Sequence, residues 1–393
     1  MAVIYKEYEC KSMLRMHKYV DNWFWSSASV SPYKACEHAC NYCDGRSEKY
    51  HASEDFDQIV HVKINALEIL KKELDRLLPK QKILSDFGGG KTKDNRKLKP
   101  VVAVSSGISD AYQPVEKKYG LTRKILELFR DYKVPTYVMT KSDLVLRDLD
   151  LLREINERAW CNVSFSVSTL DKKIAKIFEP RATSPLKRLE AMKTIANKGI
   201  LAGVTYIPII PYITDFDEQL EDTIKTSKEY CARYILAGTM TMRDLQAKRF
   251  YEILEMHYPD LVEKYKALYR SGIGPEDKYF ADLYPKVLSL CKKYGIQNYI
   301  PRYIPNIELK KNVETSTMLF LISYLLSLEG KSRYKIQAFN KLAQTIENMD
   351  ENIEDIYRTG KLDEIKGIGK TTKRLIEEFL KTGKYKYLEG LRR

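Results

Sequence analysis

The pattern of apolar residues changes along the chain and indicates two kinds of structure. Between about residues 100 and 240, short apolar runs alternate with segments in which apolar residues recur every three or four positions. Uninterrupted runs are typical of strands covered on both faces, and the wider spacing is typical of amphipathic helices. This alternation predicts βαβ units and a parallel sheet. The predicted strands are 58–62, 101–104, 136–139, 163–167, 201–210 and 232–236.

Helical spacing continues after the strand pattern has stopped. The helices predicted beside the strands are 65–78, 122–132, 148–158, 171–178, 185–198 and 217–230, and those beyond residue 315 are 315–328, 334–349, 353–359 and 373–380. A chain of 393 residues can form one large and one small domain. We therefore predict an α/β domain over residues 1–312 and an all-helical domain over residues 315–393.

Composition and charge narrow the class of protein. An apolar fraction of 44% can support a core, so an ordered protein is expected. No apolar run approaches the roughly 20 residues of a membrane span, and the N-terminus lacks a signal-peptide core, so we expect no membrane association and a cytoplasmic location. A net charge of +14 favours a polyanionic partner, with nucleic acid first. A Lys- and Glu-rich thermophile composition would explain many charges but not their positive excess.

Three of the seven cysteines, Cys36, Cys40 and Cys43, form a CxxxCxxC loop. Cysteine thiolates at short spacings hold iron–sulfur clusters, and three of them leave one iron of a four-iron cluster open to a small molecule. A zinc site would need a fourth ligand, which His38 inside so tight a loop is poorly placed to supply. An odd, clustered set of cysteines also argues against a secreted disulfide framework. The scattered Cys161 is expected to be a small buried hydrophobe.

Polar residues follow the predicted strands, where sites on parallel barrels are built. Serines in such positions can simply cap helices. However, Ser164, Ser166 and Ser168 recur at period two and share one strand face, where a structural strand would carry Val or Ile. This pattern favours contact with a polar ligand. The polar candidates at strand ends are Ser105, Ser106, Asp110, Tyr112, Lys141, Ser166 and, after the next helix, Arg181.

Near the C-terminus, a Gly-Ile-Gly turn lies between two short predicted helices. Backbone N–H groups in such a turn can bind an anion, which suits a DNA phosphate, although many proteins use the same sequence simply as a tight turn. Three lysines surround it and favour the DNA interpretation. The residues concerned are Lys366, Gly367, Ile368, Gly369, Lys370 and Lys373.

The CxxxCxxC loop with Tyr42 before its last cysteine resembles that of the radical S-adenosylmethionine (SAM) enzymes. The resemblance implies a partial (β/α)6 barrel, a [4Fe–4S] cluster on Cys36, Cys40 and Cys43, and S-adenosylmethionine bound to the open iron beside Tyr42. The reduced cluster of that family cleaves the cofactor to a 5′-deoxyadenosyl radical. An electron donor such as a flavodoxin or ferredoxin is therefore expected as a partner.

The motifs SPYxxCEHxCxYC, SDAYQPVE, TKSDLVLRDLDLL, FSVSTLD and FEPRATSP occur in an order that resembles the spore photoproduct lyase family and its relatives labelled DNA repair photolyases. That resemblance, from about residue 30 to 300, implies that Lys141 and Ser166 contact the cofactor, with Ser105 and Ser106 near its methionine end. Two positions depart from the family. Its hydrogen-donating cysteine corresponds to Gly107, and its tyrosine after the last cluster cysteine corresponds to Asp44. Repair of the spore thymine dimer by the family's standard route is therefore not expected.

The C-terminal stretch from Phe339 to Leu391 resembles the helix-hairpin-helix domain of family X DNA polymerases. Such hairpins contact the DNA backbone, so they position the protein without specifying sequence. The lysine that forms a Schiff base in some of those enzymes is Leu375 here, so that lyase activity is not implied.

These features together predict a radical enzyme acting on DNA, of the lyase class, in lesion repair or in modification of a base or sugar. Asp110, Tyr112 and Arg181 are the candidates for the substrate side on position alone. Two alternatives remain open at this point: a radical enzyme that modifies RNA or protein, and a DNA-binding protein whose cluster is structural or redox-sensing.

Overall fold

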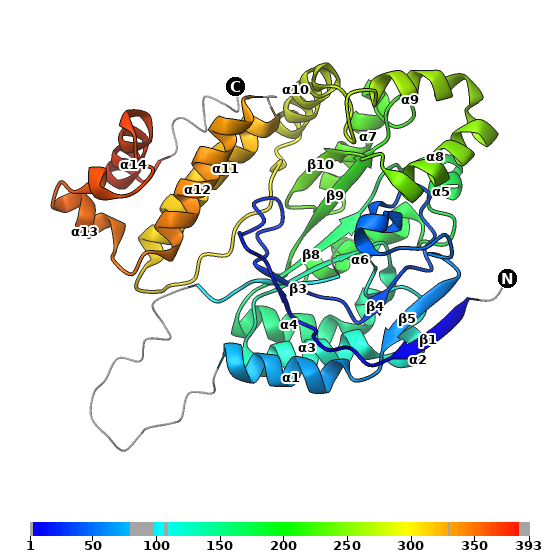
Figure 1. The fold of residues 1–393 in the computed structure, drawn as a ribbon, viewed down its shortest axis with the longest axis horizontal. Helices are drawn as coiled ribbons and strands as arrows, with labels where there is room; N and C mark the ends of the chain where they lie inside the picture. Colours follow the sequence, from blue (N-terminus) through cyan, green and yellow to red (C-terminus); the bar gives the residue numbers. More distant parts are fainter. Residues whose placement is uncertain (1–2, 79–97, 106–108, 329–330, 385–393) are drawn as a thin grey trace. The chain divides into compact units, whose positions relative to one another are not determined.

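The computed structural model describes residues 3–78, 98–105, 109–328 and 331–384 (Figure 1). Two compact units are present. The first contains residues 3–17, 26–78 and 100–300, and the second contains 18–25 together with the described part of 301–384. Each unit is described by itself below.

The first unit is built on a sheet in which six parallel strands follow one another in sequence order. A two-residue strand, β2 (Arg15–Met16), joins one edge antiparallel. The predicted partial (β/α)6 fold class is therefore confirmed. The parallel strands are β3 (Ala28–Val30), β6 (Val102–Val104), β7 (Thr136–Thr140), β8 (Cys161–Ser166), β9 (Leu201–Ile209) and β10 (Ile235–Thr239).

One of the six predicted strands, residues 58–62, does not belong to the main parallel sheet. Residues 58–62 do form a strand, β5 (Ile59–Lys63), but it pairs with β1 (Ile4–Tyr8) and β4 (Tyr33–Lys34) in a separate three-stranded sheet. Its residues alternate between buried and half-buried, as expected for a strand covered on one face. The sixth strand of the main sheet is β3, which is too short to produce a recognisable apolar run.

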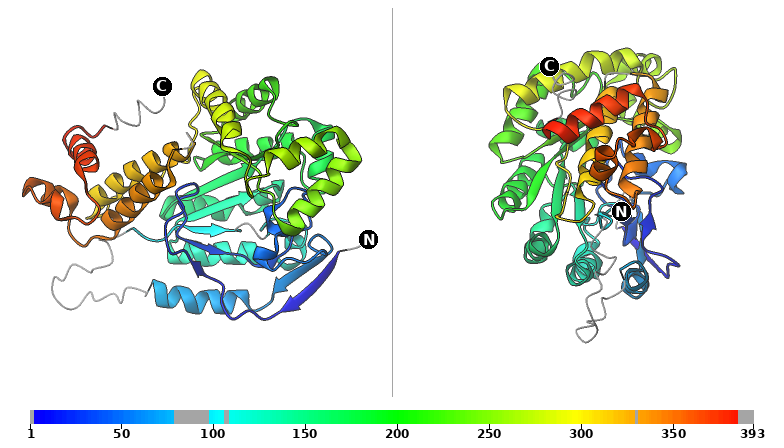
Figure 2. Two further views of the ribbon diagram at one scale, coloured as in Figure 1. Left: turned by 45° about the horizontal axis from the view of Figure 1, so that its top comes forward. Right: turned by 90° about the vertical axis from the view of Figure 1, so that its left-hand side faces the viewer.

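Helices cover the outside of the parallel sheet, and α1, α3 and α4 lie beside one another in the right-hand view of Figure 2. Local sequence explains several helix starts: Asp171 caps one helix by accepting from the backbone N–H of Lys173 and Ile174, and Pro185 occupies the first turn of the next. The helices of this part are α1 (Ala66–Leu77), α2 (Glu116–Tyr119), α3 (Leu121–Tyr132), α4 (Leu149–Arg158), α5 (Lys172–Phe178), α6 (Pro185–Ala196) and α7 (Asp217–Glu229). Three more follow the last strand: α8 (Asp244–His257), α9 (Val262–Leu268) and α10 (Asp277–Lys293).

A hydrogen-bonded layer of tyrosines lies inside the sheet. The Tyr137 hydroxyl donates to Ser164 Oγ at 3.0 Å, and the Tyr234 hydroxyl donates to Asn162 Oδ1 at 2.8 Å. Ser164 Oγ also lies 2.5 Å from the Tyr234 hydroxyl, so this serine is satisfied within the protein. A Cβ atom on Gly203 would come within 2.7 Å of the Tyr234 ring, so only glycine allows this close approach.

The second unit is helical, as predicted. Its helices are α11 (Lys310–Leu328), α12 (Arg333–Asn348), α13 (Ile353–Arg358) and α14 (Lys370–Thr382). Within this unit, the Arg302 guanidinium lies 4.8 Å from the Trp25 ring centroid and donates to both carboxylate oxygens of Glu347 at 2.7 Å. Segment 18–25 is thus part of the unit's core. None of the helices in the described ranges combines the length and the apolar character that crossing a bilayer requires.

Candidate functional site

The cysteine loop follows β4 and is held closely by the surrounding backbone. Ala35 and Ala39 have φ values of 71° and 57°, which fold the chain tightly. The Cys36 N–H donates to the Phe56 carbonyl at 3.2 Å, and the Asn41 N–H donates to the Phe178 carbonyl at 2.8 Å. The loop is therefore anchored at both ends.

Side chains from distant segments fix the loop further. Glu37 accepts from the Val115 N–H at 2.6 Å, and its own N–H donates to Gln113 Oε1 at 2.8 Å. Arg46 Nε donates to the Cys40 carbonyl at 3.0 Å. Gln246 Nε2 donates to the Tyr42 carbonyl at 2.9 Å. A loop held by this many bonds is preorganised to receive a ligand.

The chemistry of the three thiols fits a cluster. Cys36 and Cys40 are buried and Cys43 is half-buried. Burial raises the pKa of all three thiols, that of Cys40 to about 12, so the free protein does not favour thiolates here. A cationic iron centre would reverse that preference, because the thiolate is the ligand form. Within the described ranges, no group of three or more His, Cys, Asp or Glu side chains is arranged to hold a single metal ion.

The structure brings together three residues predicted to bind the cofactor: Tyr42, Lys141 and Ser166. Lys141 and Ser166 lie at the carboxyl ends of the adjacent strands β7 and β8, and Lys141 Nζ donates to Ser166 Oγ. Lys141 Nζ also lies 5.5 Å from the Tyr42 ring centroid. The Tyr42 hydroxyl is hydrogen-bonded to Ser168 Oγ at 2.8 Å.

Two further residues, Glu179 and Arg188, join this group and were missed in the sequence. Glu179 accepts from the Tyr42 hydroxyl and pairs with Arg188, and it lies 3.8 Å from Lys141 Nζ. Burial alone would raise the pKa of Glu179, but Arg188 and Lys141 lower it to about 2. Glu179 lies inside the FEPR motif, yet no spacing marks it as functional. Arg188 occupies a helix position where a surface cation is equally common.

Three buried hydroxyls of the parallel sheet have no partner among the described residues: two directly follow strands, and the third, that of Thr205, lies within β9. The side-chain oxygens of Ser31, Ser105 and Thr205 are buried and have no hydrogen-bond partner among the described residues. Ser31 and Ser105 directly follow the paired strands β3 and β6, and the Ser105 N–H donates to the Val30 carbonyl at 3.0 Å. Buried polar groups are normally satisfied, so these hydroxyls fit a polar cofactor such as S-adenosylmethionine. Ser106 and Gly107 lie outside the described residues.

The three substrate-side candidates separate into two environments. Asp110 is buried and accepts from Thr140 Oγ1 at 2.7 Å and from the Lys141 N–H at 2.8 Å. Burial raises its pKa, but His38 and these hydrogen bonds together hold it below its ordinary value. Asp110 therefore links the segment after β6 to the end of β7 through hydrogen bonds. Tyr112 and Arg181 instead line a common cavity of about 470 Å³.

Asp44, which occupies the position of the family's tyrosine, is hydrogen-bonded to a tyrosine that the sequence spacing did not indicate. The Tyr50 hydroxyl donates to Asp44 Oδ2 at 2.9 Å, and Thr241 Oγ1 donates to Asp44 Oδ1 at 2.8 Å. Burial and this hydrogen bond raise the pKa of Tyr50 to about 12. A phenol therefore lies beside the cluster loop, although it is not the residue after Cys43.

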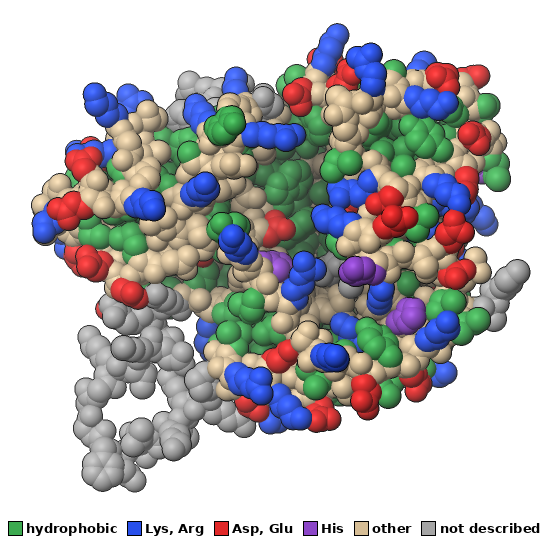
Figure 3. Space-filling view, in the orientation of Figure 1, with side chains coloured by type: hydrophobic (Ala, Val, Ile, Leu, Met, Phe, Trp, Pro, Cys, Tyr) green, Lys and Arg blue, Asp and Glu red, His purple; other side chains and the backbone are tan. Residues whose placement is uncertain are grey.

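In the helical unit, the Gly-Ile-Gly turn has the local geometry of a hairpin. Gly367 has a φ of 98°, which favours glycine, and Gly369 is the N-cap of α14. Lys366 and Lys370 are exposed and have no ion-pair partner among the residues described, whereas Lys373 pairs with Asp363. Lys and Arg side chains, interspersed with acidic ones, surround this region in Figure 3.

Comparison with known proteins adds two family matches. The Radical SAM superfamily matches residues 30–226, and a helix-hairpin-helix domain matches residues 310–385. An uncharacterized protein of Mycobacterium tuberculosis is 27% identical over 272 residues, covering 68% of this chain and 74% of that protein. An uncharacterized protein of Methanocaldococcus jannaschii is 29% identical over 236 residues, covering 60% and 77%.

Solved structures with a similar fold include mutants of spore photoproduct lyase. One has a TM-score of 0.56 at 14% identity and covers 76% of this chain and 82% of its own. Another, with bound AdoMet and dinucleoside spore photoproduct, has a TM-score of 0.52 at 15% identity and covers 70% and 77%. At this identity the similarity establishes a shared fold.

Proposed function

Because the chain belongs to the radical SAM superfamily, whose cofactors are a [4Fe–4S] cluster and S-adenosylmethionine, we propose that it is a radical enzyme acting on DNA. The bound cofactors supply a 5′-deoxyadenosyl radical for hydrogen abstraction. The main support for the proposal is that this superfamily match and a C-terminal helix-hairpin-helix match occur in the same chain. We propose that residues 1–312 perform the chemistry and residues 315–393 bind DNA.

The site supports a specific division of roles. Cys36, Cys40 and Cys43 hold the cluster, and Lys141 and Ser166 hold S-adenosylmethionine beside Tyr42. Glu179 holds the Lys141 ammonium and the Tyr42 hydroxyl in place. Ser31 and Ser105 supply hydroxyl groups that have no hydrogen-bond partner among the described residues, at the neighbouring strand ends.

The DNA part of the proposal depends on the hairpin. Lys366 and Lys370 can each contact a phosphate, and the Gly369 backbone at the start of α14 can approach it closely, since no side chain intervenes. Such contacts hold the backbone without reading bases. Lesion repair, or modification of a base or sugar, is the reaction class that follows, and we favour a lyase because a spore photoproduct lyase mutant of similar fold holds a dinucleoside spore photoproduct.

The fate of the radical differs from the family's standard route in this proposal, because Asp44 and Gly107 replace the tyrosine and cysteine of the relay. The electron that starts the reaction would come from a flavodoxin- or ferredoxin-like donor. A reducing cytoplasm suits a chain whose seven cysteines are all free.

Anaerobic turnover is the decisive test. Reconstituted, reduced protein is incubated with S-adenosylmethionine and a panel of damaged oligonucleotides, and 5′-deoxyadenosine release and deuterium transfer are measured. The Cys40→Ala variant controls for background cleavage. Release that DNA stimulates supports the proposal; release stimulated only by RNA or a protein favours that substrate class; no release leaves the cluster as a structural or sensing group.

Point variants of the hairpin are better controls than truncation at residue 315. Removing α11 would expose Trp25 and Trp23, whose rings contact Phe320 and Tyr324 of that helix at 6.0 and 5.3 Å between centroids. A truncated chain would therefore lose more than its DNA contacts.

A further inference from the structure

The cavity lined by Tyr112 and Arg181, called here the Tyr112 cavity, lies where the segments after three adjacent parallel strands meet. Tyr112 and Lys117 follow β6, Ser142 follows β7, and Arg181 follows β8. His38 of the cysteine loop completes the wall. With a volume of about 470 Å³, the cavity is within the usual range for a small-molecule site.

Two buried side chains in its wall present polar groups. The Tyr112 side chain is 1% exposed; burial and the adjacent Asp148 carboxylate raise the pKa of its hydroxyl, which makes no hydrogen bond of standard geometry with the described residues. His38 is 3% exposed; Nε2 lies 3.3 Å from Asp110, but Nδ1 has no partner among the same residues. Buried polar groups are rarely left unsatisfied, so both indicate a ligand with hydrogen-bonding atoms.

The charges around the cavity select an anion. Among the described residues, Lys117 has no ion-pair partner, and the Arg181 guanidinium donates to the Asp57 carbonyl at 3.0 Å without a carboxylate partner. Asp143 is the acidic residue in the wall, and it accepts from Thr183 Oγ1 at 2.9 Å. Two cations therefore face one carboxylate.

The remaining cation of the wall and the acids behind it neutralise one another. Arg147 pairs with Glu116 at 2.6 Å and with Asp148 at 2.7 Å. Asp148 pairs in addition with Arg123 at 3.0 Å. The uncompensated charge is thus that of Lys117 and Arg181.

From these observations we propose that the Tyr112 cavity binds a phosphate monoester, supplied either by a free nucleotide or by the 5′ end of a nucleic acid strand. The phosphate oxygens accept from the Tyr112 hydroxyl and from His38, and the ammonium and guanidinium of Lys117 and Arg181 balance their charge. The inference stands apart from the proposed function, because occupancy of the cavity requires neither hydrogen abstraction nor the hairpin.

Calorimetric titration of the anaerobically reconstituted protein tests it, with thymidine 5′-monophosphate, thymidine and inorganic phosphate as probes. Thymidine should bind at least about 10-fold more weakly than its monophosphate, because charge-assisted hydrogen bonds are lost. Lys117→Gln and Arg181→Gln should each weaken monophosphate binding by about 10-fold, and Tyr112→Phe by several-fold.

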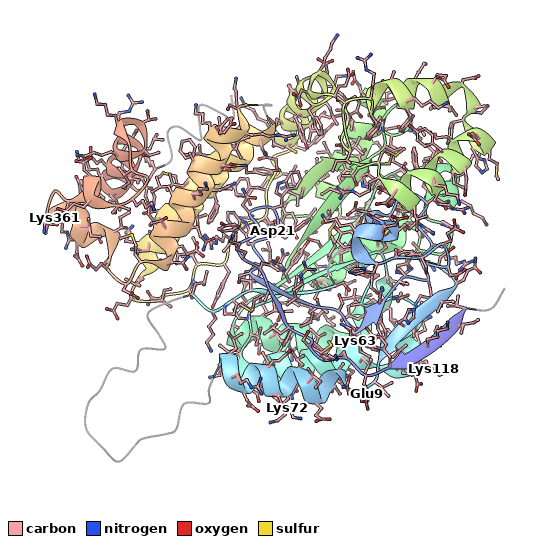
Figure 4. The ribbon with its side chains drawn as sticks, in the orientation of Figure 1. Glu9, Asp21, Lys63, Lys72, Lys118 and Lys361 are labelled. Carbon is pink, nitrogen blue, oxygen red and sulfur yellow. The ribbon has the colours of Figure 1, made fainter. Side chains whose placement is uncertain are left out.

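Lys118→Gln is the matched control. Lys118, labelled in Figure 4, is adjacent to Lys117 in sequence. It packs on the rings of Tyr5 and Tyr119 and does not line the cavity. Equal binding of thymidine and its monophosphate, no binding of either phosphate probe, or equal losses in Lys118→Gln and Lys117→Gln would overturn the proposal.

Competition by oligonucleotides then separates the two sources. If a 5′-phosphorylated strand displaces the monophosphate and a 5′-hydroxyl strand does not, the ligand is a strand end. If neither strand displaces it while the Lys117 and Arg181 variants still lose affinity, the ligand is a free nucleotide. Turnover assays can succeed or fail independently of both results.

Discussion

Arg188 and Glu179 form an ion pair in which each side chain is only 1% exposed. Arg188 also donates to the Ser166 carbonyl at 2.5 Å and to the Thr183 carbonyl at 2.6 Å, and Glu179 accepts from the Tyr42 hydroxyl. The pair therefore connects the cysteine loop to the end of β8. The pair fixes the positions of Tyr42 and Ser166, two of the cofactor-binding candidates, and we assign it no contact with substrate.

Replacing Arg188 by methionine should destabilise the protein strongly. The variant leaves buried Glu179 with only the more distant Lys141 ammonium, at 3.8 Å, and breaking a buried pair on one side typically costs about 3–5 kcal/mol. Chemical unfolding of the cluster-free protein measures the effect. Arg181→Met, the same change at an exposed arginine, should alter the free energy of unfolding by no more than about 0.5 kcal/mol; similar losses in both variants would contradict the role given to the pair.

The same pair predicts a loss of stability in acid. Arg188 and Lys141 outweigh desolvation and lower the pKa of Glu179 from 4.5 to about 2, so the folded state favours the carboxylate. This contribution is complete above the unfolded pKa and disappears as the pH falls from about 4.5 towards 2. Unfolding of wild type and Glu179→Gln should therefore differ more at pH 6 than at pH 3. An unchanged difference would show that Glu179 does not titrate in this range.

Alanine at Cys36, Cys40 or Cys43 should each abolish the cluster. Three thiolates are the protein's whole ligand set in this assignment, and loss of one leaves two irons open. Iron and sulfide content and the visible absorption of reconstituted protein provide the measurement. Cys231→Ala, at the exposed cysteine, should retain full iron, and equal loss there would point to nonspecific reconstitution.

Lys141→Met should weaken S-adenosylmethionine binding by about 10-fold or more while iron content stays unchanged, because a charge-assisted contact is removed. Ser166→Ala should cause a smaller loss, since the Lys141 ammonium remains paired with Glu179. Equilibrium binding to the reconstituted protein distinguishes these effects. Lys172→Met, at an exposed lysine that begins α5, controls for the change of charge. Unaltered affinity in Lys141→Met would remove Lys141 from the site.

At the hairpin, Lys366→Gln and Lys370→Gln should each weaken duplex binding and reduce the slope of log affinity against log salt by about 0.9. Lys373→Gln should have less effect, because its ammonium is already paired with Asp363. Binding is measured over a range of salt concentrations. Lys72→Gln, in α1 of the other unit (Figure 4), should leave the slope unchanged. A slope that falls equally in all variants would indicate general charge attraction.

Features whose parts lie close together along the chain could be predicted from the amino-acid sequence. Cys36, Cys40 and Cys43 are recognisable because one short loop supplies all three thiols. The order of strands and helices could be predicted from the spacing of apolar residues. A strand buried on both faces has a continuous apolar run, and a helix buried along one face has apolar residues every three or four positions. Lys141 and Ser166 lie where sites on parallel barrels are built, and the resemblance to the spore photoproduct lyase family singled them out as cofactor contacts.

Contacts between side chains that are distant in sequence could be identified only in the folded chain. Tyr42 and Glu179 are separated by 137 residues, and neither lies in a pattern that predicts the other. The place of β3 in the sheet was likewise undetectable, because three residues leave no periodicity. Nor could the sequence show that, among the described residues, His38 Nδ1 and the Tyr112 hydroxyl make no hydrogen bond of standard geometry, since satisfaction of a buried donor depends on neighbours from several segments. Long-range pairing and the burial of individual polar groups depend on the whole folded chain. The spacing of residues along a short stretch of sequence therefore does not predict them.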